Sequence, residues 1–227
     1  MTVELVSVHI PKAGGASLAR ILGQTYGRRL SLLYQPPEYP LSRKLRAYAR
    51  MQFWRWWTFP GPRAIHGHFP ASEYAHLPAT FITFVRDPVA QRISTYHYHR
   101  RRFATRREIA NLEARKSLDL SIDEYLSLSF PVFSKYLDVP MERFAFIGAQ
   151  ENFDEDVQAL ARLFGLRHSP VRTNINPEGS DYHISAAQRS RFEAANPDEM
   201  NVYRKALERR SQILSQPSEF EHSSSYL

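Results

Sequence analysis

The first eighteen residues constrain the fold of this chain more than any other stretch. A short apolar run, Val6–Ile10, leads into Pro-Lys-Ala-Gly-Gly-Ala-Ser at positions 11–17, and apolar residues at helical spacing follow. This order predicts a buried strand over 3–10, a tight loop, and a helix over 16–26. The first turn of a helix carries unpaired backbone N–H groups and a partial positive charge. The junction between strand and helix therefore suits an anion.

The residues of this loop have the chemistry of a phosphate or sulfate site. Gly14 and Gly15 allow a close approach of the backbone, Lys12 adds a full charge and Ser17 a hydroxyl. The lysine lies before the glycines, whereas it follows them in the P-loop of nucleotide triphosphatases. That order argues against a triphosphatase. A strand–turn–helix without a ligand is the alternative, because Gly-Gly is often only a turn.

The composition sets the class of protein. With 227 residues, of which 43% are hydrophobic, the chain is long enough for one domain, which we expect over 1–214, with a disordered tail over 215–227. A net charge of +7 favours an anionic ligand. The absence of cysteine excludes disulfides and thiol chemistry. Neither a signal peptide nor an apolar run of about 18 residues is present, so we expect a soluble, cytoplasmic protein.

Strands alternate with helices along the chain. The patterns predict strands over 3–10, 80–85 and 143–147 and a short strand end over 64–68. They predict helices over 16–26, from Pro88 through 102, and over 119–128, 152–164, 185–194 and 198–214. This alternation predicts an α/β fold, a P-loop-like three-layer αβα arrangement with a central parallel sheet. A ligand would lie at the carboxyl ends of the strands.

A second candidate for anion binding follows the strand over 80–85. Arg86 is expected at the carboxyl edge of the sheet, and Ser94 lies about two helical turns later. A guanidinium fork matches a phosphate, and a hydroxyl adds a neutral hydrogen bond. Asp87 is placed to cap the helix that Pro88 opens. Alternatively, Arg86 and Asp87 form a local ion pair and Ser94 lies on the helix surface.

Two histidines, His66 and His68, are two residues apart. On a strand their side chains would point to the same face. Three interpretations compete: a metal site, for which no third ligand is evident; structural histidines in a loop; and a general base, for which an unperturbed pKa of about 6.5 is apt.

Two segments together, Pro11–Leu18 and Val85–Tyr96, resemble the two phosphate-binding motifs of sulfotransferases that use 3′-phosphoadenosine 5′-phosphosulfate (PAPS). The likeness is greatest to the heparan sulfate 2-O-sulfotransferases and related carbohydrate sulfotransferases, and it extends to His66–His68 and 147–151. The resemblance implies transfer of a sulfuryl group from PAPS to a hydroxyl of a carbohydrate or glycoconjugate, with PAP as the product. It also implies that no metal is needed.

The resemblance further implies a role for each matching residue. His68 would be the catalytic base with His66 in support, and Lys12 would stabilise the leaving group. The residues that would bind the cofactor are Lys12, Ala13, Gly14, Gly15, Ala16, Ser17, Arg86, Ser94, Arg172 and Asn174. The family has threonine where this chain has Ala13 and Ala16, so two hydroxyls are missing from the loop.

Other functions stay open at this point. A P-loop-type kinase is one alternative, and a basic nucleic-acid-binding protein is another, given the net charge and the Arg- and Trp-rich segments. The segment 50–59 reads best as an amphipathic helix facing the core, with sugar stacking or a membrane surface as alternatives. Under the sulfotransferase interpretation we expect no nucleic-acid partner. The net positive charge suits an acidic glycan acceptor, and it equally suits the bisphosphate nucleotide itself. The acceptor itself and the oligomeric state are not defined by the sequence.

Overall fold

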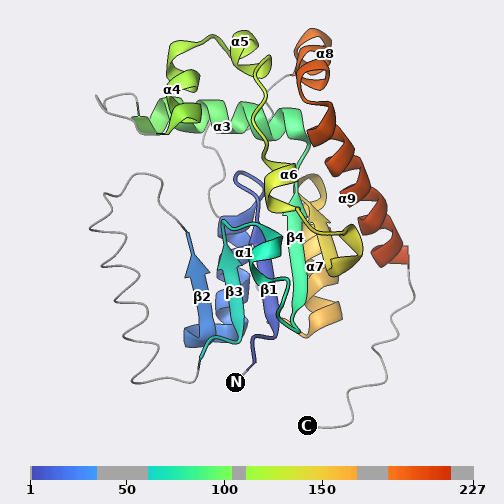
Figure 1. Ribbon diagram of the computed structural model, residues 1–227. Coiled ribbons are helices and arrows are strands. Elements are labelled where there is room, and N and C mark those ends of the chain that lie inside the picture. Colours follow the sequence, from blue (N-terminus) through green and yellow to red (C-terminus); the bar gives the residue numbers. More distant parts are fainter. Residues whose placement is uncertain (1, 35–60, 104–110, 168–183, 216–227) are drawn as a thin grey trace.

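The computed structural model describes residues 2–34, 61–103, 111–167 and 184–215. Within them, a five-stranded sheet has the order β2-β3-β1-β4-β5, and every pair of neighbouring strands is parallel (Figure 1). The strands are β1 (Leu5–His9), β2 (Leu30–Leu33), β3 (Ala64–Gly67), β4 (Thr80–Val85) and β5 (Phe144–Ala149). The predicted α/β fold with a central parallel sheet is confirmed. The edge strand β2 was not predicted.

The helices are α1 (Gly15–Tyr26), α3 (Pro88–Phe103), α4 (Leu112–Asp119), α5 (Ile122–Leu126), α6 (Phe133–Tyr136), α7 (Phe153–Phe164), α8 (Ala186–Ala195) and α9 (Pro197–Ser215). One prediction is wrong, because the chain over 119–128 is not one helix. Helix α4 ends at Asp119, and Ser121 begins α5 with a capping box in which Glu124 reciprocates. Serine competes for backbone hydrogen bonds inside a helix and is favoured at its start, which explains the break.

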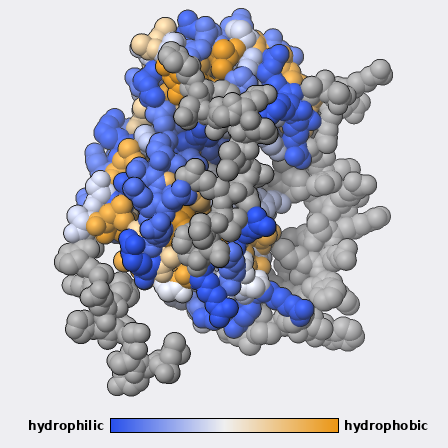
Figure 2. All heavy atoms as spheres, turned by 180° about the vertical axis from the view of Figure 1, so that it is seen from behind, coloured by the Kyte–Doolittle hydropathy of each residue, from blue (hydrophilic) through white to orange (hydrophobic). Residues whose placement is uncertain are grey.

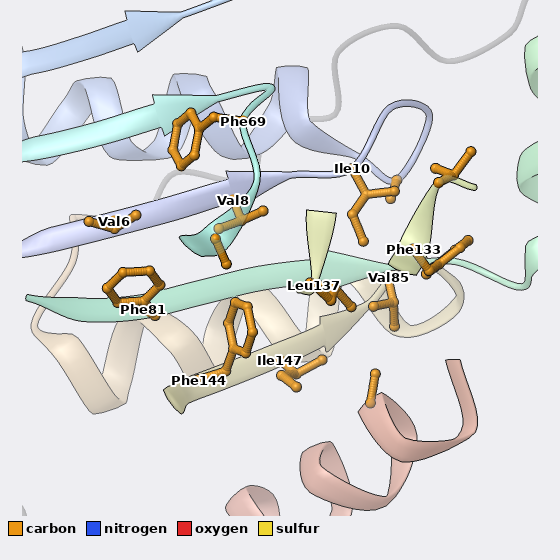
Figure 3. Packing of buried hydrophobic residues seen from close by; sticks show 14 of the residues in the cluster. Val6, Val8, Ile10, Phe69, Phe81, Val85, Phe133, Leu137, Phe144 and Ile147 are labelled. Carbon is orange, nitrogen blue, oxygen red and sulfur yellow. The ribbon is translucent and has the colours of Figure 1, made fainter. Parts of the chain in front are cut away.

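Both faces of the sheet are covered (Figure 1). Helices α6 and α9 pack on one face, where Figure 3 shows Phe81, Phe144 and Ile147 of the sheet beside Phe133 and Leu137. Helices α1 and α7 pack on the other face and enclose a second core cluster, to which the sheet contributes Leu5, Ala64, Ile82, Phe84 and Phe146. Strands buried on both faces explain why their sequences are apolar without alternation.

Helices α3, α4, α5 and α8 lie beyond the carboxyl ends of the strands (Figure 1). Val89 and Ile93 of α3 form a separate small core with Leu126 and Phe192. Asp87 Oδ1 accepts the N–H of Ala90 at 2.9 Å, as expected for a residue that caps α3. The carboxylate of Asp87 pairs with Arg189 at 2.9 Å, and no ion pair between Asp87 and Arg86 is found in the described part of the chain.

The opposite side of the molecule is mostly hydrophilic where the structure describes it, and its hydrophobic residues form small separate groups (Figure 2). None of the described helices combines the length and the apolar character needed to cross a membrane. Several sequence-based predictions lie outside the described residues: those for Arg172 and Asn174, for the segment 50–59, and for the tail beyond 215.

Candidate active site

The loop between β1 and α1 depends on its two glycines. Lys12 and Gly14 both have positive φ, 68° and 82°. A Cβ on Gly14 would lie 2.2 Å from Gln150 Oε1, and a Cβ on Gly15 would lie 1.9 Å from His9 Nε2. Both separations are far below van der Waals contact, so a larger residue at either position would displace its neighbours.

The loop leaves backbone donors without partners. The Ser17 N–H bonds to Gly14 O at 3.1 Å. Among the described residues, the N–H groups of Gly14, Gly15 and Ala16 have no acceptor. Such donors at the start of a helix bind an anion, and the helix dipole adds to the attraction. The predicted junction of strand, loop and helix is therefore formed, and anion binding at it stays a prediction.

Residues beyond β4 hold this loop from the other side. Gln91 is buried in α3, and its Nε2 donates to Pro11 O at 3.0 Å and to Thr95 Oγ1 at 3.2 Å. Arg86 Nη1 donates to Lys12 O at 3.3 Å. The second candidate segment of the sequence thus contacts the first, as a shared anion site requires. Gln91 was not among the predicted site residues.

Lys12 is the cation closest to the loop. Its Nζ lies 4.5 Å from the centroid of the Tyr98 ring, and it has no acidic partner in the described part of the chain. Burial, and then the charges of Arg101 and Arg86, together lower the pKa of Lys12 to about 8. Like charges gathered in this way are stabilised by an anion between them.

Both ring nitrogens of His66 are hydrogen-bonded, one of them to the loop. His66 is fully buried, and its Nε2 donates to Gly15 O at 3.1 Å because a carbonyl oxygen can only accept. Its Nδ1 therefore accepts from Ser7 Oγ at 2.8 Å. Burial, and then the neighbouring His68, lower the pKa of His66 to about 3. His66 is a neutral support of the loop, without a free nitrogen for proton transfer.

His68 follows the end of β3 and has a partner that the sequence did not reveal. Its Nε2 lies 3.1 Å from His9 Nδ1. Burial lowers the pKa of His68 to about 4, with a further contribution from the charge of Lys135. The pKa of His9 is also lowered, by burial first and then by His68 and His66. Both rings are therefore neutral near pH 7.

The pairing register explains why His9 lies there. Ser7 of β1 is opposite His66 of β3. The residues two positions further along each strand, His9 and His68, therefore lie on the same face of the sheet and next to each other. The sequence alone does not say that β1 and β3 are neighbours. With that adjacency, the i, i+2 spacing of His66 and His68 would have indicated His9.

Tyrosines surround His68 on its other sides. The ring centroid of Tyr34 lies 5.0 Å from that of His68, with the ring planes at 83°, and the ring centroid of Tyr136 lies 6.2 Å away, with the planes at 63°. Lys135 is exposed beside Tyr136, with its Nζ 5.6 Å from that ring. Reasoning from the sequence missed these residues, because isolated Tyr and Lys residues belong to no motif and have no characteristic spacing.

Helix α6 owes its position to a buried carboxylate. Glu199 of α9 accepts the N–H groups of Val132 at 2.9 Å and of Phe133 at 2.6 Å, and also bonds to Ser134. Four residues are too few to form a stable helix alone. By capping α6, Glu199 therefore holds Lys135 and Tyr136 in position.

The remaining predicted residues are less closely tied to the site. Ala13 is 1% exposed and packs in the core, whereas Ala16 is exposed at the start of α1. Ser17 is buried there. Ser94 is half-buried on α3, and its joint contact with Arg86 to one phosphate stays a prediction. In the described ranges, no group of three or more His, Cys, Asp or Glu side chains is arranged to hold a metal ion.

Comparisons with known proteins give a consistent but distant result. No family model matches the chain, and no curated protein sequence matches it. Among solved structures, it is similar to mouse sulfotransferase SULT7A1 complexed with PAP, at 17% identity over 74% of this chain and a TM-score of 0.44. It is also similar to a sulfotransferase from Alicyclobacillus acidocaldarius, at 16% identity over 96% of this chain and a TM-score of 0.45.

A third similar structure is retinol dehydratase in complex with androsterone and inactive cofactor PAP, at 11% identity over 93% of this chain and a TM-score of 0.43. The chain spans 60% of the mouse protein's length and 65% of that of retinol dehydratase, but 98% of the bacterial protein's. These three likenesses have low identities and TM-scores below 0.5, so they carry no argument about the site.

Proposed function

We propose that this protein is a PAPS-dependent sulfotransferase that modifies a hydroxyl of a carbohydrate or glycoconjugate. One observation carries the proposal: a neutral histidine, His68, lies at the same end of the sheet as a loop with open N–H groups and a lysine, Lys12, that has no acidic partner among the described residues. An anion site holds a donor of a charged group, and a neutral histidine removes a proton from an acceptor. Transfer of a charged group to a hydroxyl needs both.

The residues at the loop fit PAPS. The free N–H groups of Gly14, Gly15 and Ala16, together with Lys12, would hold its 5′-phosphosulfate. Arg86, with Ser94, would hold its 3′-phosphate, as the resemblance to the sulfotransferases implies. When bound, PAPS supplies an activated sulfuryl group whose leaving partner is a phosphate. The roles of Arg172 and Asn174 toward PAPS remain part of the proposal.

The protein's part in the reaction is positioning and proton transfer. The acceptor oxygen forms a bond to sulfur while the bond between sulfur and the phosphate oxygen breaks, and that electron pair leaves with PAP. His68 takes the proton of the attacking hydroxyl. Lys12 neutralises the charge that develops on the leaving oxygen. Loss of one such donor costs about 10²–10³ in rate.

The surroundings of His68 favour a ring-shaped acceptor with negative charge. The rings of Tyr34 and Tyr136 lie beside the base, and sugar rings stack on aromatic rings. Lys135 adds an exposed cation that would pair with an acidic substituent. These contacts support an acidic glycan, which is the acceptor type of the heparan sulfate 2-O-sulfotransferase group that the sequence resembles.

Ligand-dependent unfolding tests the nucleotide first. PAP should raise the melting temperature, because a ligand that binds only the folded state stabilises it by RT ln(1 + [L]/Kd). Lys12→Ala and Arg86→Ala should reduce this shift. A shift with ATP and none with PAP would support the kinase alternative, and a shift with RNA alone would support nucleic-acid binding.

Turnover with labelled PAPS and a panel of acidic and neutral glycans tests the reaction. We expect His68→Ala to abolish transfer while leaving the affinity for PAP nearly unchanged. His76→Ala is the matched control. His76 is exposed in the segment between β3 and β4, so this variant should leave turnover unchanged. Substantial activity of His68→Ala would show that the base is misassigned.

A further inference from the structure

The hydrogen bond between His9 and His68 constrains where protons can lie. The two ring centroids are 4.4 Å apart, and Nδ1 of His9 faces Nε2 of His68 at 3.1 Å. Between two neutral imidazoles, one must donate and the other accept. The two outer nitrogens, His68 Nδ1 and His9 Nε2, are therefore opposite in kind: when one is an N–H, the other is a lone pair.

These outer nitrogens lie at different parts of the site. His9 Nε2 lies against Gly15: a Cβ added to Gly15 would lie 1.9 Å from this nitrogen, closer than to any other atom. The Tyr34 ring contacts both histidines, at 5.6 Å from His9 and 5.0 Å from His68, whereas Tyr136 contacts His68, on the side where we place the acceptor. Among the described residues neither outer nitrogen has a hydrogen-bond partner. The pair thus connects the loop to the acceptor side.

An anion at the loop would decide between the two proton arrangements. Phosphate and sulfate oxygens accept hydrogen bonds, so they favour the arrangement with a proton on His9 Nε2. His9 Nδ1 is then a lone pair and accepts from His68 Nε2. His68 Nδ1 is left as the lone pair that can receive a proton.

We propose that His9 is a positioning residue that couples occupancy of the Gly14-Gly15 loop to His68, so that an anion on the loop makes His68 Nδ1 the proton-accepting atom. This inference rests on the proposed function, in which His68 is the base. The proton of the acceptor hydroxyl moves to His68 Nδ1, and the imidazolium that forms donates through Nε2 to neutral His9. His66 cannot take this part, because both its nitrogens are already engaged.

Nitrogen NMR of the full-length protein labelled with 15N-histidine tests this coupling without any turnover. The probes are PAP and, separately, inorganic phosphate, and binding is followed through the backbone amides of Gly14 and Gly15. On binding, His68 Nδ1 should become fully pyridine-like, while His68 Nε2 and His9 Nε2 become pyrrole-like. His76 is the internal control and should not change. Binding without this change at His68, or with the opposite change, overturns the proposal.

The outcomes separate the two proposals. If phosphate binds and changes the tautomer of His68 but PAP does not bind, the coupling stands and the PAPS function is wrong. If PAP binds and the tautomer does not change, the PAPS function stands and the coupling is wrong. If neither anion binds the loop, both are wrong.

Two variants of His9 separate its contact with His68 from its contact with the loop. Asparagine keeps a polar group near the position of Nδ1 but has no atom at Nε2, so in His9→Asn the anion should no longer change the His68 tautomer. His9→Leu loses both contacts, and its kcat should fall by about 10- to 100-fold because the imidazolium loses a charge-assisted bond. His9→Asn should recover part of that loss. Equal kcat values for the three proteins would contradict the positioning role.

Discussion

Two glycine substitutions on one helix test how tightly the loop and the histidines are packed. Gly15 and Gly23 both lie in α1, and glycine within a helix costs about 0.5–1 kcal/mol relative to alanine. A Cβ at Gly23 meets nothing within 4 Å. Gly23→Ala should therefore stabilise the protein by about 0.5–1 kcal/mol. That variant is the matched control for Gly15→Ala.

At Gly15 the same methyl group meets the His9 ring. The Cβ would lie between 1.9 and 2.1 Å from Nε2, Cδ2 and Cε1, so the ring must move away. The ring is held by its bond to His68 and by stacking on His66 at 5.1 Å. Overpacking costs about 1–3 kcal/mol, and the lost hydrogen bond about 0.5–1.5 kcal/mol. We expect Gly15→Ala to destabilise the fold by about 2–4 kcal/mol.

Thermal unfolding followed by circular dichroism measures both effects. For a chain of this size, 1 kcal/mol corresponds to about 2–4 °C in melting temperature. Gly15→Ala should melt about 4–16 °C below the wild type, and Gly23→Ala about 1–4 °C above it. If Gly15→Ala were as stable as Gly23→Ala, the His9 ring would be free to leave, and the packing described for this site would be wrong.

Two further predictions concern charge. Burial and neighbouring cations lower the pKa of Lys12 to about 8, and only the protonated form of Lys12 attracts an anion. The affinity for PAP, measured by calorimetry, should therefore fall as pH rises through about 8. The variant Lys12→Arg stays charged, so its affinity should show no such fall. A pH-independent affinity of the wild type would exclude Lys12 from the site. Glu199→Gln should lower the free energy of unfolding in urea by about 2–3 kcal/mol, because a buried carboxylate that accepts from Val132 and Phe133 is lost. The exposed neighbour Asp198 is its control, since Asp198→Asn should cost less than about 1 kcal/mol; equal losses would contradict the capping role of Glu199.

The elements with a clear local pattern were predictable. The continuous apolar run over 80–85 became β4, and the amphipathic pattern over 152–164 became α7, each within a residue of its expected bounds. The break at Leu120 was missed because the capping box of Ser121 depends on one hydrogen-bonded turn rather than on periodicity. Strand β2 was missed because it pairs only with β3, from which it is distant in sequence.

The sequence by itself determined the loop at which we propose that an anion binds. The order of strand, Lys12, Gly14, Gly15 and helix is local, and local sterics and the helix dipole fix its chemistry. Only the tertiary structure decided the contacts of each histidine: His66 supports the loop, and His9 is hydrogen-bonded to His68. His9 and His68 are 59 residues apart, and they meet because β1 and β3 are neighbours in register. Pairing between distant strands depends on the packing of the whole sheet, and no short stretch of sequence encodes it.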